Sequence, residues 1–353
     1  MTRPIRVGIL GASGYGAGEL LRLLTQHPLA EAVSVISSRP GEAVDSLHPH
    51  LRGFCRLRTQ AAPDWDALTS GEQAIVVSAM PHGESGRALD AVLTEAEARG
   101  IGERLKVIDL SGDLRLSDPA THARYYPESP ALAKCRGAFV YGLPELFRER
   151  IRAARCVANP GCLASAAILA VAPLMDESFR GPVAIDAKTG SSGSGRSLKE
   201  TTHHPTRHAD FRAYKPLEHQ HEGEILQAWG DPSGRRVALS FVAQSMDTTR
   251  GIFATAHLTL DEPVTGAGLM ERYVEFYRSS PFVRVVPGSP TLQDVVGSNF
   301  CDVSIAARGR QVIAMAALDN LVKGMAGAAI QNMNLMCGLN ETTGLWMPSL
   351  RPL

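Results

Sequence analysis

Apolar positions in the first third of the chain fall into short β-branched runs separated by segments of helical spacing. The runs at residues 5–10, 32–38, 74–80 and 106–111 predict strands. The segments at residues 19–29 and 84–98 predict helices. Strands that alternate with helices are typical of a parallel sheet covered by helices, so the first half is predicted to be an α/β domain.

The pattern changes in the second half, where apolar and polar residues alternate as in strands. Residues 182–190, 236–243 and 251–260 predict strands, and residues 301–318 predict a hairpin closed by Arg308, Gly309 and Arg310. Consecutive strands without long helices between them indicate a mainly antiparallel sheet. The domains are predicted at residues 1–160 and 161–321, the second being α+β, and a C-terminal helix within 322–353 is expected to return to the first.

A glycine-rich turn, GASGYGAG at residues 11–18, follows the first predicted strand and precedes the first predicted helix. This order is typical of a Rossmann-type, doubly wound parallel sheet, in which backbone N–H groups at the helix start hold a pyrophosphate. The spacing is G-x-x-G-x-x-G or G-x-G rather than the plain G-x-G-x-x-G. The second strand ends in Ser37, Ser38 and Arg39 and has no acidic residue there. Hydroxyl and guanidinium groups suit a 2′-phosphate, which favours NADP(H); alternatively, Arg39 only begins a surface loop.

Composition narrows the class of partner. The 353 residues contain 36 Lys plus Arg and 36 Asp plus Glu, a balance that argues against nucleic acid or an anionic membrane as partner. Six cysteines occur without a C-x-x-C pair, and the N-terminus reads as a strand rather than a signal peptide. No apolar run is long enough for a membrane helix. We expect a cytoplasmic protein that binds a small molecule.

Cys162 follows the turn Asn159-Pro160-Gly161 and begins a long run of small and apolar residues. A cysteine there either packs as a small hydrophobic residue or acts as a nucleophile, because a helix N-terminus favours the thiolate. Five of the eleven histidines lie in the polar segment 201–225, namely His203, His204, His208, His219 and His221. Their spacing does not favour zinc, so a general acid/base is the better interpretation. A thiol beside a hydride cofactor suggests covalent chemistry on an aldehyde or acyl group.

Ten stretches in a fixed order resemble one family. They are GASGYGAGELLRLL, SAMPHGES, DLSGDLRL, YGLPEL, ANPGC, SGSGR, EHQHEGEI, TTRGIFAT, GSNFCDV and LDNLVKGMAGAAIQNMN, and they cover residues 7 to about 345. Together they resemble N-acetyl-γ-glutamyl-phosphate reductases, which are related to aspartate-semialdehyde dehydrogenases. The resemblance implies NADPH-dependent reduction of N-acetyl-γ-glutamyl phosphate to the semialdehyde in arginine biosynthesis, with phosphate release through a cysteine thioester.

The resemblance also implies residue roles, with no metal. Cys162 is the expected nucleophile, and His219 is the expected acid/base, with His221 the second choice. The expected cofactor-binding residues are Gly11, Ser13, Gly14, Tyr15, Gly16, Ser38, Arg39, Pro81, Ser192 and Asn320. Asn320 has an alternative role as a strand-end cap. The candidates for binding the substrate and its phosphate are Arg115, Asn159, Lys188, Arg196 and Arg207, with Arg212 as a further arginine.

Some residues depart from the arginine-pathway pattern. This chain has HQH where those reductases mostly have HRH, so a basic residue is missing at Gln220, and it has GEI where PEI is common. The segments THHPTR and YKP resemble a lysine-pathway branch, whose members reduce an aminoadipyl phosphate tethered to a small acidic carrier protein. The arginine-pathway substrate remains favoured, with carrier-bound aminoadipyl or glutamyl phosphate as the alternative.

Two further alternatives belong to other functional classes. One is a non-catalytic NADP-binding redox sensor, because a fold does not determine a function. The other is a dehydrogenase of alcohols without a covalent step, which would tolerate loss of Cys162. The predicted antiparallel sheet offers a face to a second subunit, so a homodimer or homotetramer is expected.

Overall fold

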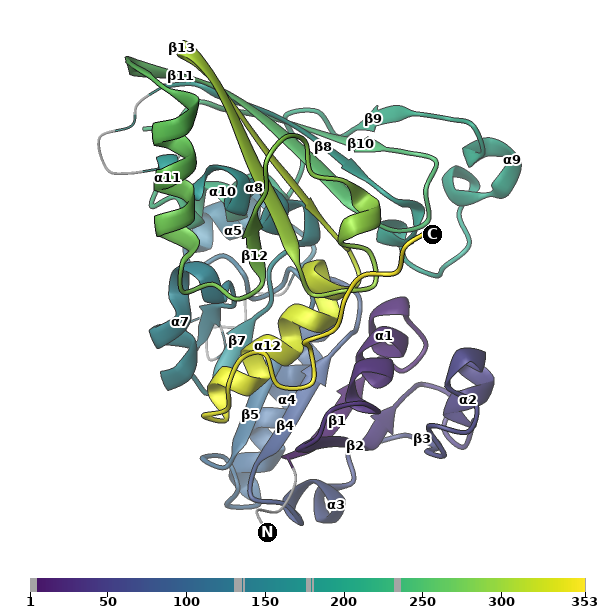
Figure 1. Ribbon diagram of the computed structural model, residues 1–353. Coiled ribbons are helices and arrows are strands. Elements are labelled where there is room, and N and C mark those ends of the chain that lie inside the picture. The colour runs from purple at the N-terminus through teal and green to yellow at the C-terminus, as the bar shows by residue number, and fades with distance from the viewer. Residues whose placement is uncertain are drawn as a thin grey trace. The chain divides into compact units, whose positions relative to one another are not determined.

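The computed structural model describes residues 5–129, 135, 137–175, 179, 181–231 and 236–352 (Figure 1). Contacts divide the chain into two units. Unit 1 consists of Met1–Pro119, Tyr126–Pro160 and Met325–Trp346. Unit 2 consists of Ala120–Tyr125, Gly161–Gly324 and Met347–Leu353.

Unit 1 contains a seven-stranded sheet in the order β3-β2-β1-β4-β5-β7-β6, and every strand pair in it is parallel. The strands are β1 (Ile5–Leu10), β2 (Ala30–Ile36), β3 (Thr59–Gln60), β4 (Ala74–Ser78), β5 (Leu105–Asp109), β6 (Phe139–Tyr141) and β7 (Cys156–Ala158). The predicted doubly wound α/β class is confirmed. The three strands absent from the sequence prediction have only two or three residues each, too few to form an apolar pattern.

Helices cover this sheet because apolar residues point to both of its faces. The helical elements are α1 (Tyr15–Leu24), α2 (Val44–Leu47), η1 (Pro49–Leu51), α3 (Trp65–Thr69), α4 (Ser85–Ala98), α7 (Pro144–Ala153) and α12 (Gly327–Met336). Alternate strand residues such as Val76 and Val107 share one buried cluster with Leu68 of α3 and Leu89 of α4. Helix α12 packs against α1, α7 and β5, so the C-terminal part of the chain completes unit 1 (Figure 1).

Unit 2 contains a six-stranded sheet in the order β12-β13-β11-β8-β10-β9. The strands are β8 (Val183–Thr189), β9 (Arg212–Tyr214), β10 (Leu239–Ser245), β11 (Ile252–Val264), β12 (Val283–Val285) and β13 (Cys301–Leu318). Three of its pairs are antiparallel, whereas β8–β10 and β12–β13 are parallel. The sheet is therefore mixed, with antiparallel pairs in the majority. The parallel pair β8–β10 arises because the chain between them passes through helix α10 (His221–Ala228) before it returns.

The predicted hairpin at residues 301–318 is wrong, because this segment is the single long strand β13. Its beginning pairs with β12 through Val283 and Cys301, and its end pairs with β11 through Ile252 and Leu318. Gly309 has a φ of +61° and lies at an irregularity in the β11–β13 register. The glycine therefore produces a local distortion of the strand and not a chain reversal.

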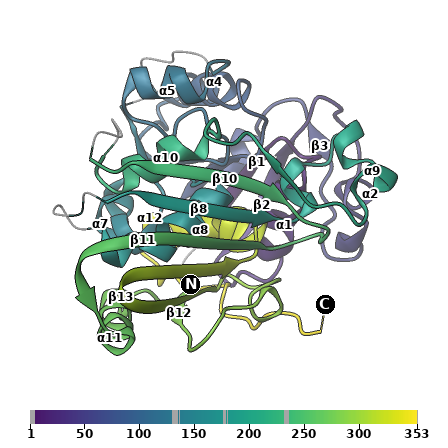
Figure 2. The same ribbon diagram turned by 90° about the horizontal axis from the view of Figure 1, so that it is seen from above.

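The other helical elements of unit 2 cover the sheet or connect its strands. They are α5 (Pro119–Tyr125), α8 (Cys162–Val171), η2 (Ala172–Leu174), η3 (Ser191–Ser194), η4 (Glu200–Thr202), α9 (His204–Arg207), α11 (Gly266–Tyr277), η5 (Leu292–Asp294) and the π-helical segment Val322–Ala326. Helix α8 contacts β8, β11 and β13, and Figure 2 shows it behind the sheet. Apart from Cys162 every residue of α8 is buried, as expected for a helix that is apolar on all sides. In the described residues no helix is long and apolar enough to span a membrane.

Candidate active site

Cys162 is the first residue of α8, directly after the N-cap Gly161. Its side chain is partly exposed, while the nine residues that follow it in the helix are buried. Gly324 of the π-helical segment lies so close that a methyl group there would be 2.6 Å from Cys162 Cβ. The thiol thus stands at the positive end of a buried helix, a position that favours a thiolate. The predicted helix start at Cys162 is confirmed.

A carboxylate joins the turn before Cys162 to the histidine pair. The Gly161 N–H donates a hydrogen bond to Glu224 Oε2 at 2.8 Å, and Glu224 Oε1 lies 3.8 Å from His221 Nε2. The His221 ring packs on Gly161, where a methyl group would be 2.3 Å from Nε2. Glu224 is fully buried in α10. Only a glycine at position 161 lets this imidazole approach the residue that precedes the nucleophile.

His219 packs edge-on against His221, with ring centroids 4.6 Å apart. The backbone N–H of His221 donates to His219 Nδ1 at 3.2 Å, so the neutral His219 ring carries its proton on Nε2. Burial lowers the pKa of His219 to about 2, with further lowering by His221 and Lys215 and an opposing effect of Glu224. At neutral pH His219 is therefore an uncharged imidazole that can donate a hydrogen bond.

Tyr214 of β9 extends this cluster, although it is not among the site residues predicted from the sequence. Its ring lies edge-on to His219, with centroids 5.6 Å apart. Burial raises the pKa of the Tyr214 phenol, a Cys162 thiolate raises it further, and the Arg207 guanidinium lowers it. Cys162, Tyr214 and Arg207 are thus within electrostatic reach of one another. The only signal in the sequence was an aromatic residue within a polar segment.

The candidate phosphate ligands of unit 2 differ in their surroundings. Arg207 is buried and donates to the Met246 carbonyl at 3.2 Å, and burial lowers its pKa. Arg196 is exposed in the loop after η3, and Arg212 donates to Asp210 and to the Thr201 carbonyl. Buried residues of β8 alternate with less buried ones, and helix α8 packs on the sheet face that carries the buried set. Lys188 belongs to the less buried set, so it lies on the opposite face of the sheet.

Arg115 and Asn159 lie together in unit 1. The Arg115 guanidinium donates to the Asn159 carbonyl at 2.7 Å and to the Leu110 carbonyl at 2.8 Å. The Asn159 amide donates to the Met325 carbonyl at 3.1 Å and accepts from Asn332 at 3.0 Å. These contacts hold the turn that leads toward Cys162, so both residues have a structural role there.

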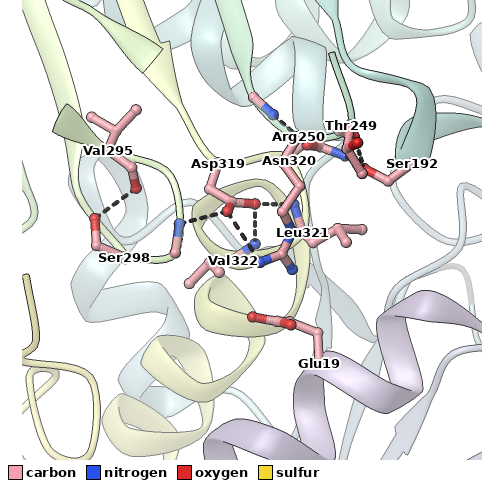
Figure 3. Close-up of polar contacts among 12 residues, drawn as sticks. Glu19, Ser192, Thr249, Arg250, Val295, Ser298, Asp319, Asn320, Leu321 and Val322 are labelled. Carbon is pink, nitrogen blue, oxygen red and sulfur yellow. Dashed lines mark hydrogen bonds and ion pairs between the residues drawn. The ribbon is translucent and has the colours of Figure 1, made fainter. Parts of the chain in front are cut away.

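The side chains of Asn320 and Ser192 are hydrogen-bonded to each other in unit 2 (Figure 3). Asn320 Nδ2 donates to Ser192 Oγ at 2.9 Å, and Asn320 Oδ1 accepts from the Gly251 N–H at 2.8 Å. Ser192 Oγ in turn donates to the Thr249 carbonyl at 2.7 Å. The neighbouring Asp319 carboxylate accepts from the N–H groups of Leu321 and Val322 (Figure 3). Asn320 therefore joins two loops, as a capping residue does.

The glycine turn of unit 1 has the shape of a phosphate cradle. Gly11 has a φ of +86°, and a methyl group there would lie 2.9 Å from the Ala79 backbone. Helix α1 starts after Gly14 with no side-chain cap and with no acidic residue in its first turn, so its N-terminal N–H groups suit an anion. Ser13, Tyr15 and Gly16 belong to the same turn and helix start. The residues present therefore fit a dinucleotide.

Other expected cofactor residues lie at the edges of unit 1. Ser38 and Arg39 are exposed just beyond β2, and the Arg39 guanidinium is 3.3 Å from Glu42 Oε1. Pro81 is exposed in the turn before α4. The Asp113 carboxylate fixes that turn, because it accepts hydrogen bonds from the N–H groups of Gly83 and Gly86.

Comparison with known proteins identifies the class. The family model of the semialdehyde dehydrogenase NAD binding domain matches residues 6–154, and that of the semialdehyde dehydrogenase dimerisation domain matches residues 162–320. Aspartate semialdehyde dehydrogenase II from Vibrio cholerae, complexed with ASA, has the same fold with a TM-score of 0.67 and 16% identity over 96% of this chain and 99% of that chain. The enzyme from Candida albicans with NADP gives a TM-score of 0.66 and 12% identity over 94% and 98% of the two chains. The protein is an oxidoreductase of the semialdehyde dehydrogenase type (EC 1.2.1), with an NAD(P)-binding domain.

Curated relatives narrow the family. N-acetyl-gamma-glutamyl-phosphate reductase from Symbiobacterium thermophilum is 43% identical over 97% of both chains, and that from Pelotomaculum thermopropionicum is 39% identical over 99% of both. A putative [LysW]-L-2-aminoadipate 6-phosphate reductase from Thermomicrobium roseum is also 39% identical over 99% of both. The chain belongs to the N-acetyl-γ-glutamyl-phosphate reductase family.

Proposed function

We propose that this enzyme reduces N-acetyl-γ-glutamyl phosphate to N-acetylglutamate semialdehyde with NADPH, in arginine biosynthesis. The observation that carries the proposal is Cys162 at the first position of a buried helix, with the Glu224–His221 pair against the preceding Gly161. The curated relatives with this activity in their names support the substrate. Six thiols without a disulfide fit the reducing cytoplasm.

The proposed reaction starts at the Cys162 sulfur. The thiolate attacks the acyl carbon, the bond from that carbon to the phosphate oxygen breaks, and a thioester and inorganic phosphate form. When bound, NADPH supplies the hydride that reduces the thioester carbon. The tetrahedral oxyanion that results, a deprotonated thiohemiacetal, forms the aldehyde C=O as its carbon–sulfur bond breaks, which releases the aldehyde and regenerates the thiolate.

The histidine pair is proposed to handle the protons and the oxyanion. His221, paired with Glu224 beside Gly161, takes the proton of the Cys162 thiol and passes it to the departing phosphate. His219 donates its Nε2–H toward the negative oxygen that develops during attack, because its Nδ1 already accepts from the backbone N–H of His221. Arg207 is the favoured ligand of the substrate phosphate, because its guanidinium and Cys162 both act on the Tyr214 phenol.

The test is the reverse reaction with the semialdehyde, NADP⁺ and phosphate, run with wild type, Cys162→Ser and Cys156→Ser. We expect turnover by wild type and by Cys156→Ser, since Cys156 is a buried thiol of β7. Cys162→Ser should lose almost all activity while keeping NADPH binding, because no other group forms the thioester. A Cys162→Ser enzyme of near-normal rate would contradict the covalent step and support a simple dehydrogenase.

The carrier-bound substrate is a second candidate. Phe211 and Leu217 are each 59% exposed in the segment that also contains Arg212 and Lys215. Exposed apolar side chains beside basic ones suit a small acidic carrier protein, and the Thermomicrobium roseum relative bears LysW in its name. Turnover only with the aminoadipyl or glutamyl semialdehyde on its carrier would support this candidate and overturn the free substrate.

A second copy of the chain is the proposed partner for the outer face of the unit 2 sheet. Helix α8 covers the other face, while Val242, Phe253 and Met315 on the outer face are only half-buried and Ile313 is 37% exposed. The matching family model is a dimerisation domain. Sedimentation analysis should give a homodimer or homotetramer, and Ile313→Lys should shift it to the monomer. A monomeric wild type would refute this assembly.

A further inference from the structure

His48 of unit 1 contacts the glycine turn from a distant part of the chain. It lies between α2 and η1, is 4% exposed, and has its Nε2 2.7 Å from the carbonyl oxygen of Ala12. A carbonyl oxygen can only accept, so Nε2 carries the proton and donates the hydrogen bond.

The His48–Ala12 hydrogen bond affects whether backbone N–H or carbonyl groups of the glycine turn face a bound anion. The Ala12 N–H donates to the Ile36 carbonyl at 3.1 Å, and its carbonyl is held by His48. A carbonyl oxygen carries partial negative charge and repels a phosphate, whereas the free N–H groups of a helix start attract it. Bonding to His48 keeps the Ala12 carbonyl in one orientation and neutralises part of its charge.

Gly18 of α1 makes the close approach possible. A methyl group at this position would lie 2.6 Å from His48 Nδ1 and 2.8 Å from Cε1. The ring therefore occupies the space that a side chain of α1 would take. Through this packing and the hydrogen bond, His48 joins the segment after β2, where Ser38 and Arg39 lie, to the start of α1.

We propose that His48 is a positioning residue for the cofactor: it fixes the glycine turn in the conformation that binds the pyrophosphate. The inference rests on the proposed function only in that NADPH is the cofactor. It concerns binding of the dinucleotide and not the chemistry at Cys162.

The first experiment compares His48→Ala and His48→Gln with His50→Ala. Loss of one buried hydrogen bond in His48→Ala should raise the dissociation constant of NADPH about tenfold, measured by calorimetry or fluorescence quenching. His48→Gln should stay within about threefold of wild type, because the glutamine amide N–H can reach the same carbonyl. His50 is the matched control: it is exposed and meets His48 only edge-on, at 5.9 Å between ring centroids, so its loss should leave binding unchanged.

Two further experiments complement the binding measurement: the first needs no cofactor, and the second leaves the imidazole in place. Amide hydrogen exchange at residues 11–16 should be faster in His48→Ala than in wild type without any cofactor present. Gly18→Ala should weaken NADPH binding as His48→Ala does, because the added methyl group displaces the intact ring. In both variants kcat at saturating NADPH should remain within about twofold of wild type, since the turn binds the cofactor away from its reacting ring.

The outcomes separate the inference from the proposed function. If wild type binds NADPH and His48→Ala binds it equally well, the positioning role is wrong and the proposed reaction is unaffected. If His48→Ala only melts at a lower temperature, with unchanged dissociation constant and exchange, His48 merely supports the fold. If wild type does not bind NADPH at all, both the proposed cofactor and this inference are overturned.

Discussion

At the scale of single residues, Glu224 connects the candidate nucleophile to the candidate acid/base. One carboxylate oxygen accepts from the Gly161 N–H, and the other faces His221. A neutral amide in its place would lose the charge that holds the imidazole, while the shape of the side chain would be kept. The geometry around Cys162 depends on this carboxylate, so its loss should act on catalysis more than on folding.

We expect Glu224→Gln to lower kcat/KM about 10- to 100-fold, because small displacements of reacting groups have effects of that size. Alkylation of Cys162 by iodoacetamide, followed against pH, should become slower near neutrality. Glu222→Gln is the control, since Glu222 also lies buried in α10 but hydrogen-bonds to Tyr125 instead. Equal effects of the two variants would contradict a specific role for Glu224.

A substitution of Arg39 tests whether the enzyme prefers NADPH over NADH. Its guanidinium is exposed beside Glu42, where it can reach a 2′-phosphate. Arg39→Ala should raise the KM for NADPH about tenfold and leave the KM for NADH unchanged, because only NADPH has the 2′-phosphate. Arg52→Ala, which removes another exposed arginine of unit 1, should change neither value. An equal response of both cofactors would show that Arg39 belongs only to a surface loop.

At the scale of elements, helix α8 depends on α11 for its last turn. The phenol groups of Tyr273 and Tyr277 donate to the carbonyls of Ala170 and Leu169, two acceptors that lack partners within the helix. Both tyrosines are buried. These bonds hold the end of α8 opposite Cys162, so they contribute to stability and lie away from the chemistry.

Tyr273→Phe should lower the free energy of unfolding by about 1–3 kcal/mol, because a buried carbonyl loses its donor. The steady-state kcat/KM should stay within twofold of wild type at a temperature well below the melting temperature. Phe276→Leu, at a 40% exposed position of the same helix, should change stability far less. Thermal unfolding followed by circular dichroism measures both, and an unchanged Tyr273→Phe melting temperature would contradict the assigned role.

At the scale of the whole molecule, buried neutral histidines make stability depend on pH. Burial lowers the pKa of His27, whose Nδ1 accepts from the Leu29 N–H and whose Nε2 meets Asn334. The unfolded chain then binds a proton below the ordinary pKa of 6.5 that the folded chain does not. Stability is therefore fully present above that pH and decreases as the pH falls below it.

The difference in unfolding free energy between wild type and His27→Gln isolates this contribution, because other titrating groups cancel. As the pH is lowered from 7 to 5, the free energy of unfolding of the wild type should fall relative to that of His27→Gln, by at most about 1.4 kcal/mol per pH unit. Urea unfolding at each pH measures it, and His50→Gln, which alters an exposed histidine outside the proposed subunit interface, is the control. A pH-independent difference would mean that His27 titrates alike in both states.

The sequence alone was enough to predict the elements with long periodic patterns and the residue types that stand at their ends. The parallel sheet followed from apolar spacing, since such patterns reflect which side of an element is buried. The glycine turn between β1 and α1 and the helix start at Cys162 followed from turn residues next to these patterns. Strands of two or three residues carry no period, and a glycine within β13 looks like a turn until its partners on either side are known.

Tertiary structure alone decided which side chains meet. Glu224 stands beside Gly161, 63 positions earlier, and His48 beside Ala12, 36 positions earlier. It also turned Lys188 to the sheet face opposite α8 and brought Tyr214 to His219. Local sequence determines the period of an element and the chemistry it carries. The positions of side chains around a site depend on how distant elements pack, and that information is spread over the whole core.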